Sequence, residues 1–265
     1  APPHNPTGAF ANFGYCPLSN PAVTLLCVHS ETVAGSVTTG NKKVPIVNPV
    51  VLQGGLIVNP ETGASTWVNA EGGETLSKTP QPVPGGLLGI TAPNWWPQFL
   101  KDLFNETINK GFTGVTSTVE LAGPVQFSLL ALFAGQGTAV TLPVKIKLNN
   151  PFLGNNCYIG SNSNPVTIPF TLGTTSPPPP NTPISGSKGE VIINEAGTHI
   201  QAFGARLVNN SFATPGASGC GGPLFSWAID PFVNSIVGLP SPAGKNTAIL
   251  EGDTELAARQ EVEAS

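Results

Sequence analysis

The chain has little charge, only two tyrosines and no methionine. Charged residues make up 10% of its 265 residues, against about a quarter in a typical soluble protein. Intrinsically disordered chains are usually charged and poor in apolar residues, whereas 40% of this chain is hydrophobic. The low charge therefore indicates a folded protein with a largely uncharged surface.

Clusters of basic residues and long apolar runs are missing as well. The 11 lysines and arginines are scattered and the net charge is −4, whereas nucleic-acid binding needs clustered cations. No apolar run approaches the length of about 20 residues that spans a bilayer. We predict no nucleic-acid partner and no transmembrane segment.

The chain contains four cysteines, and it begins with Ala1 rather than with a methionine. A small first residue is typical of signal-peptide cleavage, so we expect a secreted, extracellular protein. An even cysteine set then predicts two disulfides, and four cysteines allow three pairings. We favour Cys16–Cys27 as a short loop and Cys157–Cys220 as a long one, with buried free thiols as the alternative.

Glycine and proline are abundant, with 31 and 28 residues. Both break helices and mark turns, which favours many short strands. The sequence therefore predicts a mainly β fold, an antiparallel β sandwich or barrel with two or three short helices. The clearest strand signal is residues 138–149, where apolar side chains alternate with polar ones. Its apolar face carries Val140, Leu142, Val144, Ile146 and Leu148. Weaker strand signals lie at 23–28, 44–58, 113–121, 165–172, 189–194 and 198–208.

Two apolar segments predict helices. The first follows Asn94, a possible cap, and ends near Gly111, and its apolar stripe has helical spacing. That stripe comprises Trp96, Phe99, Leu100, Leu103, Phe104, Thr107 and Ile108. The second, at 223–239, is too short for a membrane span and is expected to be a buried or interfacial helix kinked at Pro231.

The two helices are expected to cover the ends of the β structure, to enclose a pocket for a hydrophobic ligand between themselves and the sheet, or to form an exposed hydrophobic surface that docks a neighbouring subunit. The candidate residues for that surface are Trp95, Trp96, Phe99, Leu103, Phe225, Trp227 and Phe232.

The expected organisation is one domain with two appendages. Residues 1–22 form an irregular arm, residues 23–250 a single β-rich domain, and residues 251–265 an acidic tail with a short helix. The polyproline segment 176–183 is interpreted as a surface loop rather than an interdomain linker, which is the alternative.

One loop has the composition of a catalytic site. Residues 218–223 (SGCGGP) resemble the nucleophile loop of chymotrypsin-like cysteine proteases, in which glycine N–H groups form an oxyanion hole. Cys220 would be the nucleophile and His29 its base. The orienting acid would come from Glu61, Glu71, Glu74 or Asp102. A disulfide at Cys220 would exclude this hypothesis.

Other chemical signatures are missing. Three histidines and four cysteines without C-x-x-C spacing do not form a zinc pattern, and no phosphate- or dinucleotide-binding motif occurs. We therefore predict no metal, no cofactor, no catalytic residue and no enzymatic activity.

Several segments together resemble a family of secreted proteins of actinobacteria. They are Tyr15-Cys16-Pro17 and stretches within 72–90, 150–161 and 218–250. The resemblance covers most of residues 15–250 and includes all four cysteines. It implies export and supports the disulfides. It implies no activity, because none is assigned to the family.

Three functions follow as hypotheses. The first is a non-enzymatic structural protein that self-assembles at the cell surface or into a filament, with the arm added as a strand to a neighbour's sheet edge. The alternative is a carrier for a lipid or other hydrophobic ligand. The remote alternative is the protease that uses Cys220.

Overall fold

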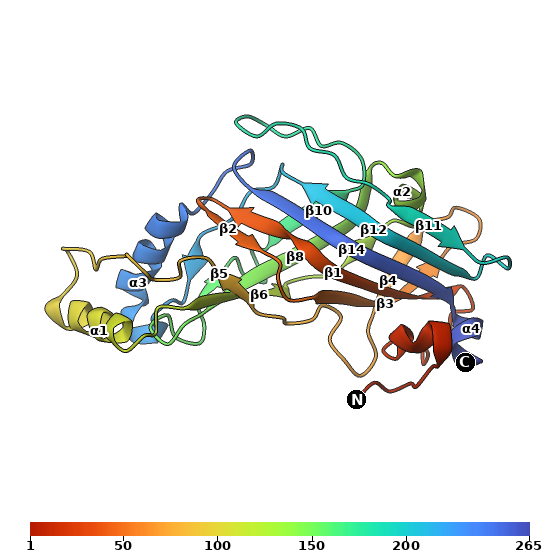
Figure 1. Cartoon of the computed structure of the whole chain (residues 1–265), viewed down its shortest axis with the longest axis horizontal. Helices are drawn as coiled ribbons and strands as arrows, with labels where there is room; N and C mark the ends of the chain where they lie inside the picture. Colours follow the sequence, from red (N-terminus) through yellow and green to blue (C-terminus); the bar gives the residue numbers. More distant parts are fainter.

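The computed structural model describes residues 1–265, and all of its named strands belong to one antiparallel sheet. The sheet has 14 strands and curls into a half-barrel (Figure 1), which confirms the mainly β prediction. Its strands are β1 (Leu25–Thr39), β2 (Lys42–Pro45), β3 (Val50–Val58), β4 (Ser65–Asn69), β5 (Gln81–Val83), β6 (Val115–Leu121), β7 (Gln126–Phe127), β8 (Thr138–Asn149), β9 (Tyr158–Ile159), β10 (Val166–Thr171), β11 (Glu190–Ile193), β12 (His199–Asn209), β13 (Ala217–Ser218) and β14 (Thr247–Ala258). The helices are the 3₁₀ helix η1 (Gly8–Phe13) and the α-helices α1 (Gln98–Asn109), α2 (Leu129–Ala134), α3 (Gly222–Val237) and α4 (Arg259–Glu263).

The alternation expected for 138–149 is present in β8. Its five apolar side chains from Val140 to Leu148 are buried, whereas Lys145 and Lys147 lie on the other face and are half-buried. β8 is the hub of its side of the sheet, because it pairs with β6, β7, β9 and β10 along its length. The long strand β1 has the same role opposite and pairs with β2, β3 and β14.

Side chains bridge the seam where the two edges of the curled sheet approach each other. At one place Gln81 of β5 accepts hydrogen bonds from the N–H groups of Val47 and Asn48 and donates to the Asn48 carbonyl. These two residues lie just after β2, separated from it by Ile46. At another place Ser65 of β4 donates to the Phe127 carbonyl in β7 over 2.6 Å. Side-chain hydrogen bonds, rather than regular backbone pairing between strands, thus join the two edges at the seam.

The expected acidic tail is wrong for residues 251–258. These residues belong to β14, which pairs with β1 on one side and with β12 on the other. Thr254 and Leu256 face inward, while Glu251 and Glu255 face Arg206 and His199 at 3.6 Å each. Paired charges on one face and buried residues on the other make this segment a strand, and only α4 beyond it is helical.

The N-terminal arm packs on its own chain. Phe13, Cys16 and Leu18 form a small second core with Leu25 of β1 and Val262 of α4. The guanidinium of Arg259 donates to the carbonyls of Leu18 and Asn20. These contacts hold the arm in place within one chain.

The Pro-rich segment 176–183 leaves the sheet and returns to it. Thr174 and Ser185 form a bridge at its base, and the amide of Asn181 donates to the carbonyls of Asn210 and Asn246. These contacts fasten the segment to the surface of the same β unit as a loop.

The helix α1 begins later than expected. Pro97, not Asn94, is its N-cap residue. Leu100, Phe104 and Thr107 are buried, but Phe99 and Leu103 of the expected stripe are exposed. The rest of the stripe is buried or half-buried, so the prediction is wrong only at the edge of the stripe, where α1 faces outward at one end of the molecule (Figure 1).

Both expected disulfides are present. Cys16–Cys27 joins the arm to β1, and Cys157–Cys220 joins the loop before β9 to the start of α3. All four residues are almost fully buried. Two disulfides are typical of proteins that fold in an oxidising compartment outside the cytoplasm.

Candidate functional site: an apolar cavity inside the half-barrel

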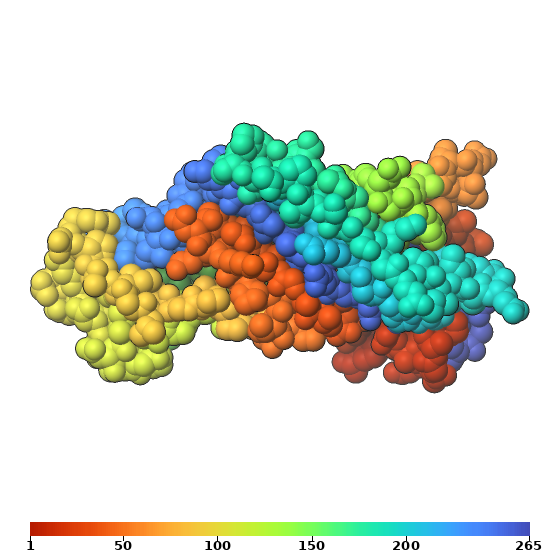
Figure 2. Space-filling model, turned by 45° about the horizontal axis from the view of Figure 1, so that its top comes forward, coloured from red at the N-terminus to blue at the C-terminus, as the bar shows by residue number.

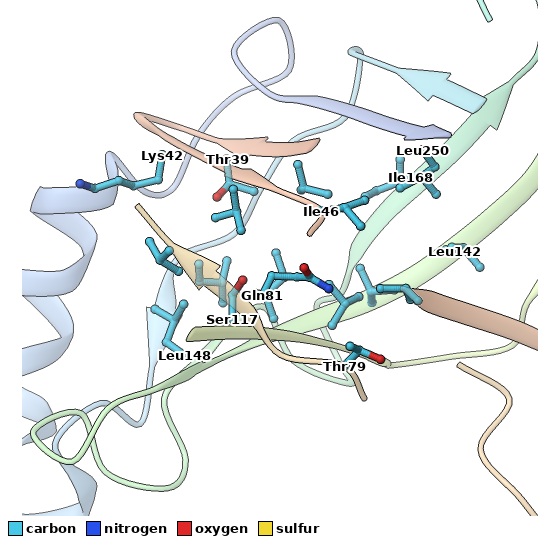
Figure 3. Close-up of a pocket in the computed structure, with 18 of the residues that line it drawn as sticks. Thr39, Lys42, Ile46, Thr79, Gln81, Ser117, Leu142, Leu148, Ile168 and Leu250 are labelled. Atoms are coloured by element: carbon cyan, nitrogen blue, oxygen red, sulfur yellow. The ribbon is translucent and has the colours of Figure 1, made fainter. Parts of the chain in front are cut away.

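An apolar cavity of about 180 Å³ lies inside the curl of the sheet. Hydrophobic side chains contribute 28 of its 38 lining residues. They come from the inward positions of the strands, such as Leu142 and Ile168, and from the inner face of α3, such as Phe232 (Figure 3). The same alternation that builds the core therefore builds the cavity wall.

Most polar groups inside the cavity already have partners. The hydroxyls of Ser30 and Thr254 lie 2.8 Å apart, and those of Ser77 and Thr79 lie 3.0 Å apart. Gln81 uses its amide in the seam described above. These groups satisfy one another, so they present little free hydrogen-bonding capacity to a ligand.

A second set of polar groups has no partner within the chain. It consists of the hydroxyls of Thr32, Thr39 and Ser117 and the ammonium of Lys42. Lys42 is the one charged residue among the 38 that line the cavity. In Figure 3 the side chains of Thr39, Lys42 and Ser117 lie toward α3, while Leu142, Ile168 and Leu250 lie at the opposite end. The cavity therefore has a polar end and an apolar end.

The polar end lies beside a recess in the surface. Figure 2 shows this recess between the β1–β2 hairpin (orange), the segment after β5 (yellow) and α3 (blue). Lys42, Val83 and Ile90 are half-buried there and also line the cavity. A ligand could therefore enter or leave at this place.

Some of the residues proposed for the hydrophobic interaction surface are buried, and the others are exposed. Trp96 and Phe232 are buried in an aromatic cluster with Phe104 and Phe152, so they do not belong to a surface. Phe225 is half-buried against Phe99, with the ring centroids 5.7 Å apart. The other candidates are exposed and, with Leu224, form a patch that we term the apolar tip. It consists of Trp95, Phe99, Leu103, Leu224 and Trp227.

The loop around Cys220 lacks the features of a nucleophile site. Its sulfur is bonded to Cys157. The carboxylate of Asp230 accepts the N–H groups of Gly219 and Cys220 at 3.2 and 2.7 Å, so these oxyanion-hole donors are already occupied. Gly219 has a φ of +75°, and a Cβ there would collide with the Asn156 carbonyl. The glycine thus serves a tight turn.

His29, the expected base, lies on β1 in register with Glu255 and Gln53. Burial lowers the pKa of its imidazole, although Glu255 and Glu31 act in the opposite direction. The imidazole is therefore neutral at pH 7, and no contact joins it to the Cys220 loop.

Metal and membrane features give no further site. No group of three or more His, Cys, Asp and Glu side chains is placed to hold a metal ion. None of the helices has the length and apolar character needed to cross a membrane.

Comparison of the chain with protein-family models, curated proteins and solved structures finds no match. The site therefore rests on its own geometry. Sequence reasoning missed Lys42, Gln81 and Ser117. The sequence did contain a signal for Lys42, because it alternates with Val44 and Ile46, and all three line the cavity from β2 and the residue that follows it.

Proposed function

We propose that the protein is a secreted, non-enzymatic carrier that binds a hydrophobic molecule inside the half-barrel. The observation that carries this proposal is the apolar cavity of about 180 Å³. Protein interiors are close-packed and contain few voids larger than a water molecule. An empty apolar cavity of this size costs on the order of 4 kcal/mol of stability, and a bound apolar molecule would recover those contacts.

The carrier proposal is tested by titrating the protein with N-phenyl-1-naphthylamine, a neutral apolar dye that fluoresces when it leaves water. We expect saturable binding of one dye per chain. Replacing Ile146 by tryptophan fills the cavity from β8 and should weaken binding at least about tenfold, since overpacked cores resist further insertion. The control is Lys147→Trp, which places the same side chain on the opposite face of β8.

Two results would contradict the carrier. One is the absence of saturable dye binding by the wild-type chain. The other is equal binding by the wild type and a folded Ile146→Trp protein. If Ile146→Trp does not fold, wild-type stability provides the second measurement. Saturating dye should raise the free energy of unfolding by about 2.7 kcal/mol at 100 times the Kd.

Self-assembly is the second candidate, and two separate apolar patches favour it. The apolar tip lies at the α1–α3 end, whereas β11, whose Val191, Ile192 and Ile193 are exposed, lies at the other end (Figure 1). β11 pairs with β12 only, so its outer edge is free for another strand. Two different patches at opposite ends favour head-to-tail contacts, which build open filaments.

Light scattering across micromolar to millimolar concentrations tests the assembly. We expect the mass to rise with concentration, and Trp227→Glu in the tip or Ile192→Lys in the edge to return it to that of one chain. Val23→Glu changes an exposed apolar residue outside both patches and should leave the mass of the assembly unchanged. A wild-type mass of one chain at every concentration would exclude the filament.

A further inference from the structure

Lys42 reaches the cavity because of its place in the β1–β2 hairpin. It stands directly opposite Thr39 in the antiparallel register, so both side chains lie on the same face. The next inward pair, Val37 and Val44, also lines the cavity. Lys43 lies between the inward positions and is exposed. The hairpin therefore places one of its two lysines at the edge of the cavity, with its ammonium pointing toward α3 (Figure 3), and the other in solvent.

The two hydroxyls near Lys42 have no hydrogen-bond partner within the chain. Thr39 and Ser117 are each only 6% exposed, and both line the cavity. Their oxygens are not among the fully enclosed polar atoms, so a ligand in the cavity can reach them. Most other hydroxyls of the cavity are paired with one another, and Thr32 is the exception. Two of the three unpaired hydroxyls and the single positive charge thus occur together at one end.

We propose that the ligand is a single-chain amphiphile with an anionic head group. This inference rests on the proposed carrier function. The head group binds the ammonium of Lys42 and the hydroxyls of Thr39 and Ser117, and the chain extends toward Leu142, Ile168 and Leu250. No lining residue is acidic, so a cationic head group would meet only Lys42.

The size of the cavity selects a single chain. A cavity of about 150 Å³ holds one benzene molecule, so the volume of about 180 Å³ holds an alkyl segment of roughly six to eight carbons by the same benchmark. A single short chain matches this capacity, whereas a lipid with two long chains exceeds it. The head group is thus a carboxylate or a phosphate monoester, which share the anionic oxygens that an ammonium and hydroxyls bind.

Lys42 has a purely structural alternative. The hairpin tip touches the end of α3, where the Asn41 N–H donates to the Val237 carbonyl over 2.7 Å. A lysine near a helix C-terminus is favourable because of the helix dipole. In that role its replacement would change stability but not the preference for one head group over another. The preference is therefore the decisive measurement.

The experiment displaces N-phenyl-1-naphthylamine from the full chain with octanoate, octyl phosphate or octanol at pH 8. These competitors share one chain length and differ in head group. We expect the wild type to bind the two anions about tenfold more tightly than the alcohol, since a tenfold ratio corresponds to 1.4 kcal/mol. Lys42→Gln should reduce this ratio to about one. Lys43→Gln, the matched control, should keep it.

The results separate the two proposals. Dye binding without a preference for the anions overturns the anionic ligand and leaves the carrier. A Lys42→Gln protein that keeps the preference likewise overturns the role of Lys42. Absence of dye binding by the wild type overturns both. Thr39→Val provides a second variant and should lower the anion-to-alcohol ratio about threefold.

Discussion

Replacing Phe104 by alanine is expected to lower the free energy of unfolding by about 4 kcal/mol. Phe104 has no exposed surface. Its ring centroid lies 5.9 Å from that of Trp96, 5.0 Å from Phe152 and 5.6 Å from Phe232. The truncation removes these aromatic contacts and leaves a cavity where α1, α3 and the loop after β8 meet.

Phe99→Ala on the same helix is the control. Phe99 is 54% exposed and contacts Phe225 on one side, so its truncation should cost about 1 kcal/mol or less. Urea unfolding followed by tryptophan fluorescence measures both variants. Equal losses would contradict the assignment of Phe104 to the core and of Phe99 to the apolar tip.

The Phe104 cluster also matters for the cavity. Phe232 belongs to the cluster and lines the cavity as well. The cluster therefore positions the helix that forms one wall of the site. The expected instability of Phe104→Ala should extend to this wall, and dye binding should weaken with it.

Local patterns were sufficient for much of the fold. The alternation in β8 identified its buried face, since side-chain direction in a strand depends only on neighbouring positions. The even cysteine count and the preference for one short and one long loop led to both disulfides. The hairpin of β11 and β12 was also visible, with the turn residues Ala196 and Gly197 between its strands.

Distant pairing explains the parts that were missed. β14 carries Glu251, Asp253 and Glu255, and an acidic segment without its partners resembles a helical tail. Only the contacts with Arg206 and His199, about 50 residues earlier in the sequence, show why these charges are compatible with a strand. The seam at Gln81 depends on residues 33 and 34 positions away, and no periodicity records such a contact.

The candidate site was less predictable than the fold. The sequence suggested that a hydrophobic cavity could lie between sheet and helices, but it directed attention to the aromatic residues of α1 and α3. The polar end depends on Thr39, Lys42 and Ser117, which come from β1, β2 and β6. These side chains come together only when the sheet curls. The pattern of polar residues within any one strand does not predict that they will meet.

Removing the disulfide Cys157–Cys220 is expected to destabilise the protein more than removing Cys16–Cys27. The cysteines are 63 residues apart in the first case and 11 in the second. In the chain-entropy description a disulfide restricts the unfolded chain more when it closes a longer loop. The expected losses are about 4 kcal/mol for Cys157→Ala/Cys220→Ala and about 3 kcal/mol for Cys16→Ala/Cys27→Ala.

Urea unfolding of the two double variants without reductant measures this difference, and each variant is the control for the other. Both pairs are almost fully buried, so the lost side-chain contacts are similar and loop length is the main difference. Equal losses, or a larger loss for Cys16–Cys27, would mean that the packing of the arm outweighs chain entropy. The longer disulfide also anchors the start of α3, whose inner face lines the cavity. Its removal should therefore weaken dye binding, whereas removal of Cys16–Cys27, at the opposite end of the sheet, should not.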